Sequence, residues 1–92
     1  MRELLKEILD YYGKDQQLLV VYEEMAELTK AITKYERGMN TSINNIIEET
    51  AHVLIILEYV KMIYEFSDKD VQGEIDKKLK KLKRYHELYP KR

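Results

Sequence analysis

The sequence predicts an all-α fold of four helices connected by short loops. Apolar residues recur at steps of three and four along four segments, as they do on the buried face of a helix. Three glycines and one proline leave few positions at which a helix has to end. Gly13, Gly38 and Pro90 lie at the ends of these segments, whereas Gly73 lies inside one and weakens it locally. The 92 residues suffice for a single helical domain over 1–92.

The first two predicted helices occupy the N-terminal part of the chain. One covers residues 2–12, because its apolar side chains form a single stripe of Leu4, Leu5, Ile8, Leu9 and Tyr12. The next covers residues 15–37, with Asp15 as its expected N-cap and Gly38 as the residue that ends it.

The other two predicted helices follow after short polar loops. The third covers residues 43–66 and is entered through Thr41 and Ser42, which are both good capping residues. The fourth covers residues 68–89 and follows Ser67. Its apolar stripe alternates steps of four and three through Ile75, Leu79, Leu82, His86 and Tyr89.

The third predicted helix is apolar around nearly its whole circumference, so it needs cover on all sides. Four helices in a chain of 92 residues are too few to provide this cover, although their short loops favour antiparallel neighbours in a bundle. We therefore expect an oligomeric helix bundle in which a second subunit packs on this helix. A two-fold homodimer is the simplest arrangement.

The balance of charges excludes several classes of partner. With 16 basic and 17 acidic residues, the net charge of −1 gives no field that would attract nucleic acid or an acidic membrane. The chain has no cysteine, so disulfides and thiolate metal sites are excluded. Residues 1–10 do not resemble a signal peptide, and residues 43–66 hold too many ionisable groups to span a membrane. We expect a soluble cytoplasmic protein.

Several acidic residues occupy unexpected positions on the predicted helices. Glu24 falls inside the apolar arc of the second helix, Glu27 lies at the edge of this arc, and Glu23 lies on the polar side. On the third helix, Glu49 and His52 both fall between apolar residues. Residues three apart share one side of a helix about one turn apart, so each helix presents two ligand-type side chains to its apolar side.

A metal site explains these buried carboxylates better than isolated packing does. One buried glutamate is usually paired with a basic residue, and one buried histidine is usually a hydrogen-bonded core residue. Four such groups on two crossing helices can meet at one point. Carboxylates suit Mg²⁺ or Mn²⁺, and the imidazole of His52 shifts the preference toward Mn²⁺, Fe²⁺ or Zn²⁺.

A cluster of basic residues lies on the fourth predicted helix. Taken alone it indicates a solvated helix face. If the metal site binds a phosphorylated substrate, Lys78, Lys81 and Arg84 are the candidates to contact its phosphates. His86 stands alone on the apolar stripe and is interpreted as a packing residue.

Two segments resemble the MazG-like nucleotide pyrophosphohydrolases, a family of the all-α NTP pyrophosphatase superfamily. Residues 22–28 read YEEMAEL, and residues 46–57 read IIEETAHVLIIL. The family pattern has two adjacent glutamates, two further residues and a third glutamate, followed by a second helix with Glu-x-x-Asp. It maps here onto Glu23, Glu24 and Glu27, then onto Glu49 and His52.

The resemblance implies an enzyme that hydrolyses a nucleoside triphosphate, NTP or dNTP, to the monophosphate and pyrophosphate with Mg²⁺. It further implies that Glu24, Glu27 and Glu49 bind the metal and that Glu23 supports them or orients the attacking water. His52 departs from the family pattern, which has aspartate there. A neutral imidazole removes one negative charge, so it favours Mn²⁺ over Mg²⁺ and puts catalysis in question.

Two alternatives remain open from the sequence. A non-catalytic helical module that keeps the fold and binds a nucleotide or a protein is one of them, because fold does not imply function. The other is a di-iron carboxylate protein, since Glu49 and His52 form a Glu-x-x-His pair of the type found in such helix bundles.

Overall fold

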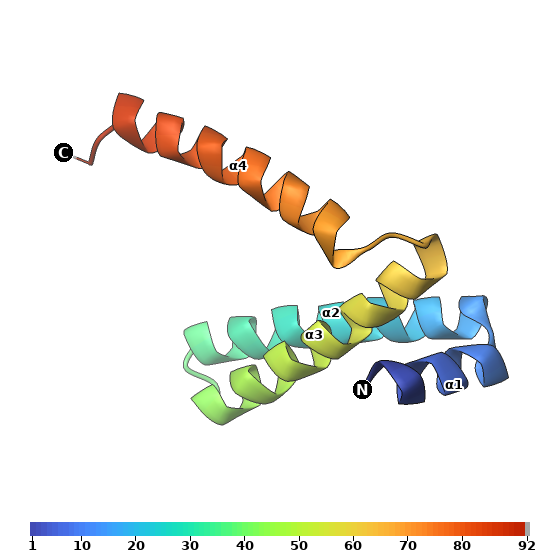
Figure 1. The fold of residues 1–92 in the computed structure, drawn as a ribbon. Coiled ribbons are helices and arrows are strands. Elements are labelled where there is room, and N and C mark those ends of the chain that lie inside the picture. Colours follow the sequence, from blue (N-terminus) through green and yellow to red (C-terminus); the bar gives the residue numbers. More distant parts are fainter. Residues whose placement is uncertain (92) are drawn as a thin grey trace.

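The computed structural model describes residues 1–91 and contains four helices, which confirms the all-α prediction (Figure 1). They are α1 (Arg2–Tyr12), α2 (Lys14–Glu36), α3 (Ile43–Tyr64) and α4 (Asp68–Leu88). Each boundary lies within two residues of its predicted position, because apolar periodicity and helix breakers are local signals that the chain carries in its own sequence.

The break between α1 and α2 is a single residue, Gly13, whose φ of 88° is readily adopted only by glycine. Gly13 also takes the N-cap position of α2, so the prediction that Asp15 caps this helix is wrong. Asp15 lies instead in the first turn, where its carboxylate interacts favourably with the positive end of the helix dipole.

The caps of α3 and α4 differ in their hydrogen bonding. Ser42 occupies the N-cap position of α3 without a side-chain hydrogen bond. Ser67 caps α4 through a capping box, in which its hydroxyl accepts from the Asp70 backbone N–H while the Asp70 carboxylate accepts from the Ser67 backbone N–H. At the C-terminal end of α3, Glu65 takes a left-handed conformation with φ 56°. The helix therefore ends two residues before its predicted end.

The core lies between α1, α2 and α3. Figure 1 shows α2 and α3 side by side and antiparallel, with α1 packed against one end of the pair. The buried apolar residues of this core are Leu5, Val21, Ile56 and Tyr59, and the partly buried side chains around them are Ile8, Leu9, Val20, Val60, Met62 and Ile63. The small number of fully covered residues reflects the size of the chain.

Helix α4 projects away from this core. Within the described residues, α4 does not pack along any other helix, and no residue of α4 is buried. The prediction of antiparallel neighbours is therefore confirmed for α2 and α3 and wrong for α4 within one chain. The radius of gyration is 17.0 Å, compared with about 12 Å for a compact domain of this length.

The outer side of α3 is not covered by the chain itself. Three large apolar residues there are at least 60% exposed, namely Ile47, Leu54 and Tyr64. The helix is thus apolar on the side that packs and on the side that does not. Among the described residues, no helix combines the length and the apolar character needed to cross a membrane.

Candidate metal centre

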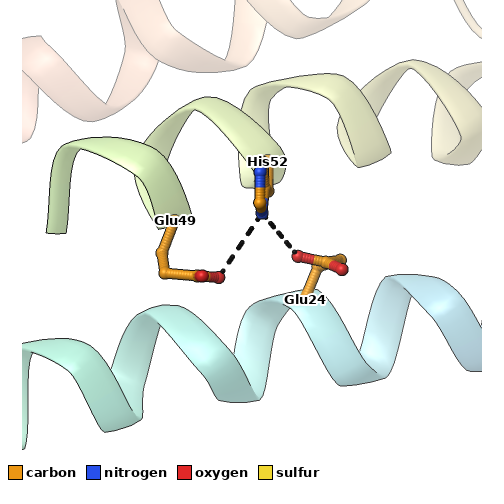
Figure 2. Close-up of side chains that lie close together, drawn as sticks. All are labelled: Glu24, Glu49 and His52. Carbon is orange, nitrogen blue, oxygen red and sulfur yellow. Dashed lines mark ion pairs between the residues drawn. The ribbon is translucent and has the colours of Figure 1, made fainter. Parts of the chain in front are cut away.

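Helices α2 and α3 bring three of the predicted site residues together at the middle of their contact. Figure 2 shows the side chains of Glu49 and His52 from α3 and of Glu24 from α2 converging between the two helices. The Nδ1 atom of His52 lies 3.2 Å from Oε2 of Glu24 and 3.6 Å from Oε2 of Glu49. One ligand atom from each residue lies within 4.8 Å of the other two.

The local reason for this convergence is the helical spacing. Glu49 and His52 are three residues apart, so they project from the same side of α3 about one turn from each other. Ile56 continues the same side of the helix and is buried against α2, which directs the whole side toward the contact. Glu24 lies one turn beyond Val21, another buried residue, on the facing side of α2.

Both carboxylates have one oxygen that is buried and lacks a hydrogen-bond partner. Among the described residues, no donor forms a well-aligned hydrogen bond with Oε2 of Glu24 or with Oε2 of Glu49. His52 Nδ1 lies within ion-pair distance of both oxygens, but neither contact is a hydrogen bond. A buried carboxylate oxygen without a hydrogen bond is unfavourable, so the arrangement favours positive charge between the two glutamates, which a bound cation would supply.

The distances suit a shared metal ion. Two ligand atoms that each lie about 2.1 Å from a tetrahedral metal are about 3.4 Å apart. The separations of His52 Nδ1 from Glu24 and Glu49, 3.2 and 3.6 Å, lie on either side of this value, and the ligand atoms of all three residues lie within 4.8 Å of one another. Two carboxylates and one imidazole provide three protein ligands, which leaves coordination positions for water or a substrate. The donor set therefore fits a divalent cation such as Mn²⁺ or Zn²⁺.

An apolar groove of about 240 Å³ adjoins two of the three residues. It is lined by Glu24 and His52 and by four apolar or aromatic residues, Val20, Ile55, Ile56 and Tyr59. Burial raises the pKa of the Tyr59 hydroxyl, so this group stays protonated at neutral pH. The apolar lining of the groove lies beside the polar groups of Glu24 and His52. The helical pattern of the sequence did not predict this groove.

The other predicted acidic residues lie outside the cluster. The side chains of Glu23 and Glu27 are exposed on α2, and neither belongs to the group of ligand atoms formed by Glu24, Glu49 and His52. Glu27 follows Glu24 by one turn, but it lies at the edge of the packed side of α2, as the sequence indicates. In this arrangement Glu27 points to solvent.

The predicted phosphate-binding residues lie on α4. Lys78, Lys81 and Arg84 are exposed, and α4 does not pack against α2 or α3 in the described part of the chain. No residue of α4 lines the groove beside Glu24 and His52. Within one subunit, the basic side chains and the candidate metal centre are therefore separate.

A second group of charged residues, not predicted from the sequence, lies at the junction of α3 and α4. The ammonium of Lys61 donates to the carboxylates of Glu58 and Asp68, and Arg2 lies 3.8 Å from Glu58. The hydrogen bond from Lys61 lowers the pKa of the Asp68 carboxyl, and the same bond raises the pKa of Lys61. The spacing of three between Glu58 and Lys61 is a sequence signal for their ion pair. The contact of Lys61 with Asp68 depends on the turn between α3 and α4.

Comparisons of the chain with protein-family models, curated proteins and solved structures find no match.

Proposed function

We propose that the protein is a metal-dependent nucleoside triphosphate pyrophosphohydrolase, which converts NTP or dNTP and water to the monophosphate and pyrophosphate. The observation that supports this proposal is the pair of buried carboxylate oxygens on Glu24 and Glu49, which have no hydrogen-bond partner and lie on either side of His52 Nδ1. The resemblance of YEEMAEL and IIEETAHVLIIL to the MazG-like pattern connects these residues to that reaction.

The residues of the chain have distinct roles in this proposal. Glu24, Glu49 and His52 hold the cation. When bound, the cation neutralises phosphate charge and promotes attack by water. Glu23 and Glu27 lie on the exposed side of α2, outside this group of ligand atoms. The apolar groove beside Tyr59 provides a surface for the base.

The basic residues of α4 would then reach the triphosphate from another subunit. Because α4 does not approach the metal centre of its own chain, Lys78, Lys81 and Arg84 can contribute only across a subunit contact or after a movement of α4. We therefore include the homodimer or homotetramer in the proposal, as a cytoplasmic assembly. The exposed apolar residues of α3, including Leu54, supply a surface for it.

The test of the proposal is the release of pyrophosphate from a panel of ribo- and deoxyribonucleoside triphosphates, each with Mg²⁺ and with Mn²⁺. We expect pyrophosphate and monophosphate in equal amounts, with faster release in Mn²⁺ because His52 supplies an imidazole ligand. A folded protein that binds Mn²⁺ and releases no pyrophosphate from any substrate would contradict the enzymatic part of the proposal.

A matched pair of variants separates the metal centre from general effects of charge. Glu49→Gln removes a ligand and should reduce turnover by a factor of about 100 or more and abolish stabilisation by Mn²⁺. Glu48→Gln removes the same charge from the neighbouring residue, whose side chain is exposed. The second variant should keep both properties, and equal losses in both variants would argue against a specific metal centre.

A second candidate function is nucleotide binding without turnover. It is favoured by the position of Glu27, which lies outside the cluster of ligand atoms, and by His52 in place of a carboxylate. In the assay above, this function gives nucleotide-dependent stabilisation without release of pyrophosphate. The di-iron alternative has less support, because the described chain brings together two carboxylates and one imidazole.

A further inference from the structure

We propose that α4 is a self-association helix, which pairs antiparallel with α4 of a second copy of this chain. The proposal does not depend on the metal centre or on the proposed reaction. It rests on an apolar stripe that the chain leaves uncovered, on the distribution of charge along α4, and on a groove at the junction of α3 and α4.

The apolar stripe of α4 extends along the whole helix. At 100° per residue, Val71, Ile75, Leu79 and Leu82 fall within an arc of about 80°, and Tyr89, the C-cap residue, follows them. These side chains are between 37% and 65% exposed, and within the described part of the chain α4 has no buried residue. A 21-residue helix gains most of its stability from packing of its apolar side, so this stripe needs a cover from outside the chain.

Charge along α4 is divided between its two halves. The acidic half, residues 68–76, carries Asp68, Asp70, Glu74 and Asp76 with a single lysine, and the somewhat longer basic half, residues 77–88, carries six Lys or Arg residues with a single glutamate. Two copies in antiparallel orientation place each acidic half beside a basic half, whereas two parallel copies place like charges together. The charge pattern therefore selects a second copy as the occupant and fixes its direction.

The positions beside the stripe specify the register. Glu74 and Lys81 lie on one flank of the stripe, seven residues apart, and Asp76 and Lys83 lie on the other flank with the same spacing. In an antiparallel pair related by a two-fold axis, each flank faces the same flank of the other copy. Ile75 then lies opposite Leu82 of the second copy. In this register Glu74 approaches Lys81 on one flank, and Asp76 approaches Lys83 on the other.

A parallel pair would reverse these contacts. Each flank would then face the opposite flank of the second copy, so Glu74 would approach Asp76 and Lys81 would approach Lys83. Both contacts bring like charges together, and like charges at such positions are destabilising. The flanking residues and the two halves of the helix thus favour the same orientation independently.

In the proposed pair, the C-terminal turns of the partner helix pack in a groove at the start of α4. It has a volume of about 380 Å³ and a mostly apolar lining of Leu57, Val60, Lys61, Phe66, Asp68, Val71, Gln72 and Ile75. In the register above, the C-terminal turns of the second copy lie beside Val71 and Gln72. These turns carry Tyr85 and Tyr89, which are 63% and 65% exposed within one chain. Their rings supply apolar surface for this groove.

Single cysteines test the orientation, because the sequence has no cysteine of its own. In the proposed register, two copies of residue 79 lie within about 2 Å of each other along the helix axes, and two copies of residue 89 lie roughly 30 Å apart. Leu79→Cys should therefore form a disulfide-linked dimer under mild oxidation, at least tenfold more than Tyr89→Cys, its matched control on the same stripe. Cross-linking of both variants to the same extent, or of neither, would overturn the antiparallel pair.

Charge exchange tests the reason for the pairing. In the Leu79→Cys background, Glu74→Lys with Asp76→Lys makes both halves of α4 basic and should reduce cross-linking by tenfold or more. Lys81→Glu with Lys83→Glu makes the corresponding positions acidic and should do the same. A mixture of the two proteins restores all four opposite-charge contacts, so it should recover the cross-link as a mixed dimer. Undiminished cross-linking in the separate variants, or no recovery in the mixture, would overturn the proposal.

Folding of these variants is checked by circular dichroism. All the substituted residues are exposed and lie outside the core of α1, α2 and α3, so the thermal unfolding of that core should stay unchanged. Sedimentation velocity at low and high salt gives a second measure. The wild-type pairing through α4 should weaken in salt because opposite charges flank it.

Discussion

His52 gives the candidate metal centre its particular chemistry. Its Nδ1 atom faces two carboxylate oxygens, at 3.2 Å from Glu24 and 3.6 Å from Glu49, and a nitrogen in this position has to donate a proton or share a cation. An all-carboxylate site would attract Mg²⁺ through charge. The imidazole instead provides a softer ligand with no charge of its own, so the site favours a transition metal.

The first prediction concerns this residue. His52→Asp adds a negative charge and two oxygen ligands, so the variant should bind Mg²⁺ more tightly and lose its preference for Mn²⁺. At about a hundred times its dissociation constant, the preferred ion should raise the free energy of unfolding by about 2.7 kcal/mol. Denaturation with each ion measures this effect. An unchanged order of ions in the variant would show that His52 does not bind the metal.

The elements differ in how their ends are stabilised. The N-terminus of α4 depends on the Ser67–Asp70 capping box and on the ion pair between Lys61 and Asp68, and it has no support from core packing. Hydrogen bonds from the backbone and hydroxyl of Ser67 lower the pKa of the Asp70 carboxyl. The local stability of this helix end is therefore sensitive to pH.

The direction of the pH effect follows from these pKa values. Because folding lowers the pKa of Asp70 and of Asp68, both groups stabilise α4 above their unfolded pKa, near 4, and this contribution is lost as the pH falls through the lower folded values. The amides of Asp70 and Val71 donate to Ser67, so their protection factors, which correct the observed hydrogen exchange for its intrinsic pH dependence, should fall below about pH 4. In Asp70→Asn these protection factors should already be lower at pH 7 and depend less on pH. Wild-type protection factors that stay constant between pH 2 and 5 would contradict this account.

At the scale of the whole molecule, three helices share a small core and the fourth projects from it. Ile56 is 3% exposed and contacts this core, whereas Leu54 on the outer side of the same helix is 63% exposed. Because this core has few buried residues, the loss of one of them removes a large share of its stability. Truncation of Ile56 should therefore cost much more stability than truncation of Leu54, although both carry a branched aliphatic side chain.

This inequality gives the last prediction. Ile56→Ala should destabilise the protein by about 2–5 kcal/mol through lost burial and the cavity that remains. Leu54→Ala should change the free energy of unfolding by less than about 0.5 kcal/mol in dilute protein. Chemical denaturation at a low and a high protein concentration checks both values. A cost for Leu54→Ala that grows with concentration would locate a subunit contact on the outer side of α3.

Much of the fold and of the site could be predicted from the sequence, because those features depend on local spacing. The helix boundaries followed from apolar periodicity and from breaks such as Gly13, and spacings of three and four determined that Glu24, Glu49 and His52 lie on apolar sides of their helices. The sequence by itself therefore determined the helices, their apolar stripes, and the positions of two glutamates and one histidine among the apolar residues.

Only the tertiary structure decided which of these sides meet. The crossing of α2 and α3 brings Glu24 to Glu49 and His52 and leaves Glu27 exposed, because the step of three residues rotates Glu27 by about 60° to the edge of the packed side of α2. The left-handed turn at Glu65 and the bridge from Lys61 to Asp68 direct α4 away from the core. Both outcomes depend on contacts between segments that are separate in sequence, and local periodicity carries no information about their relative orientation.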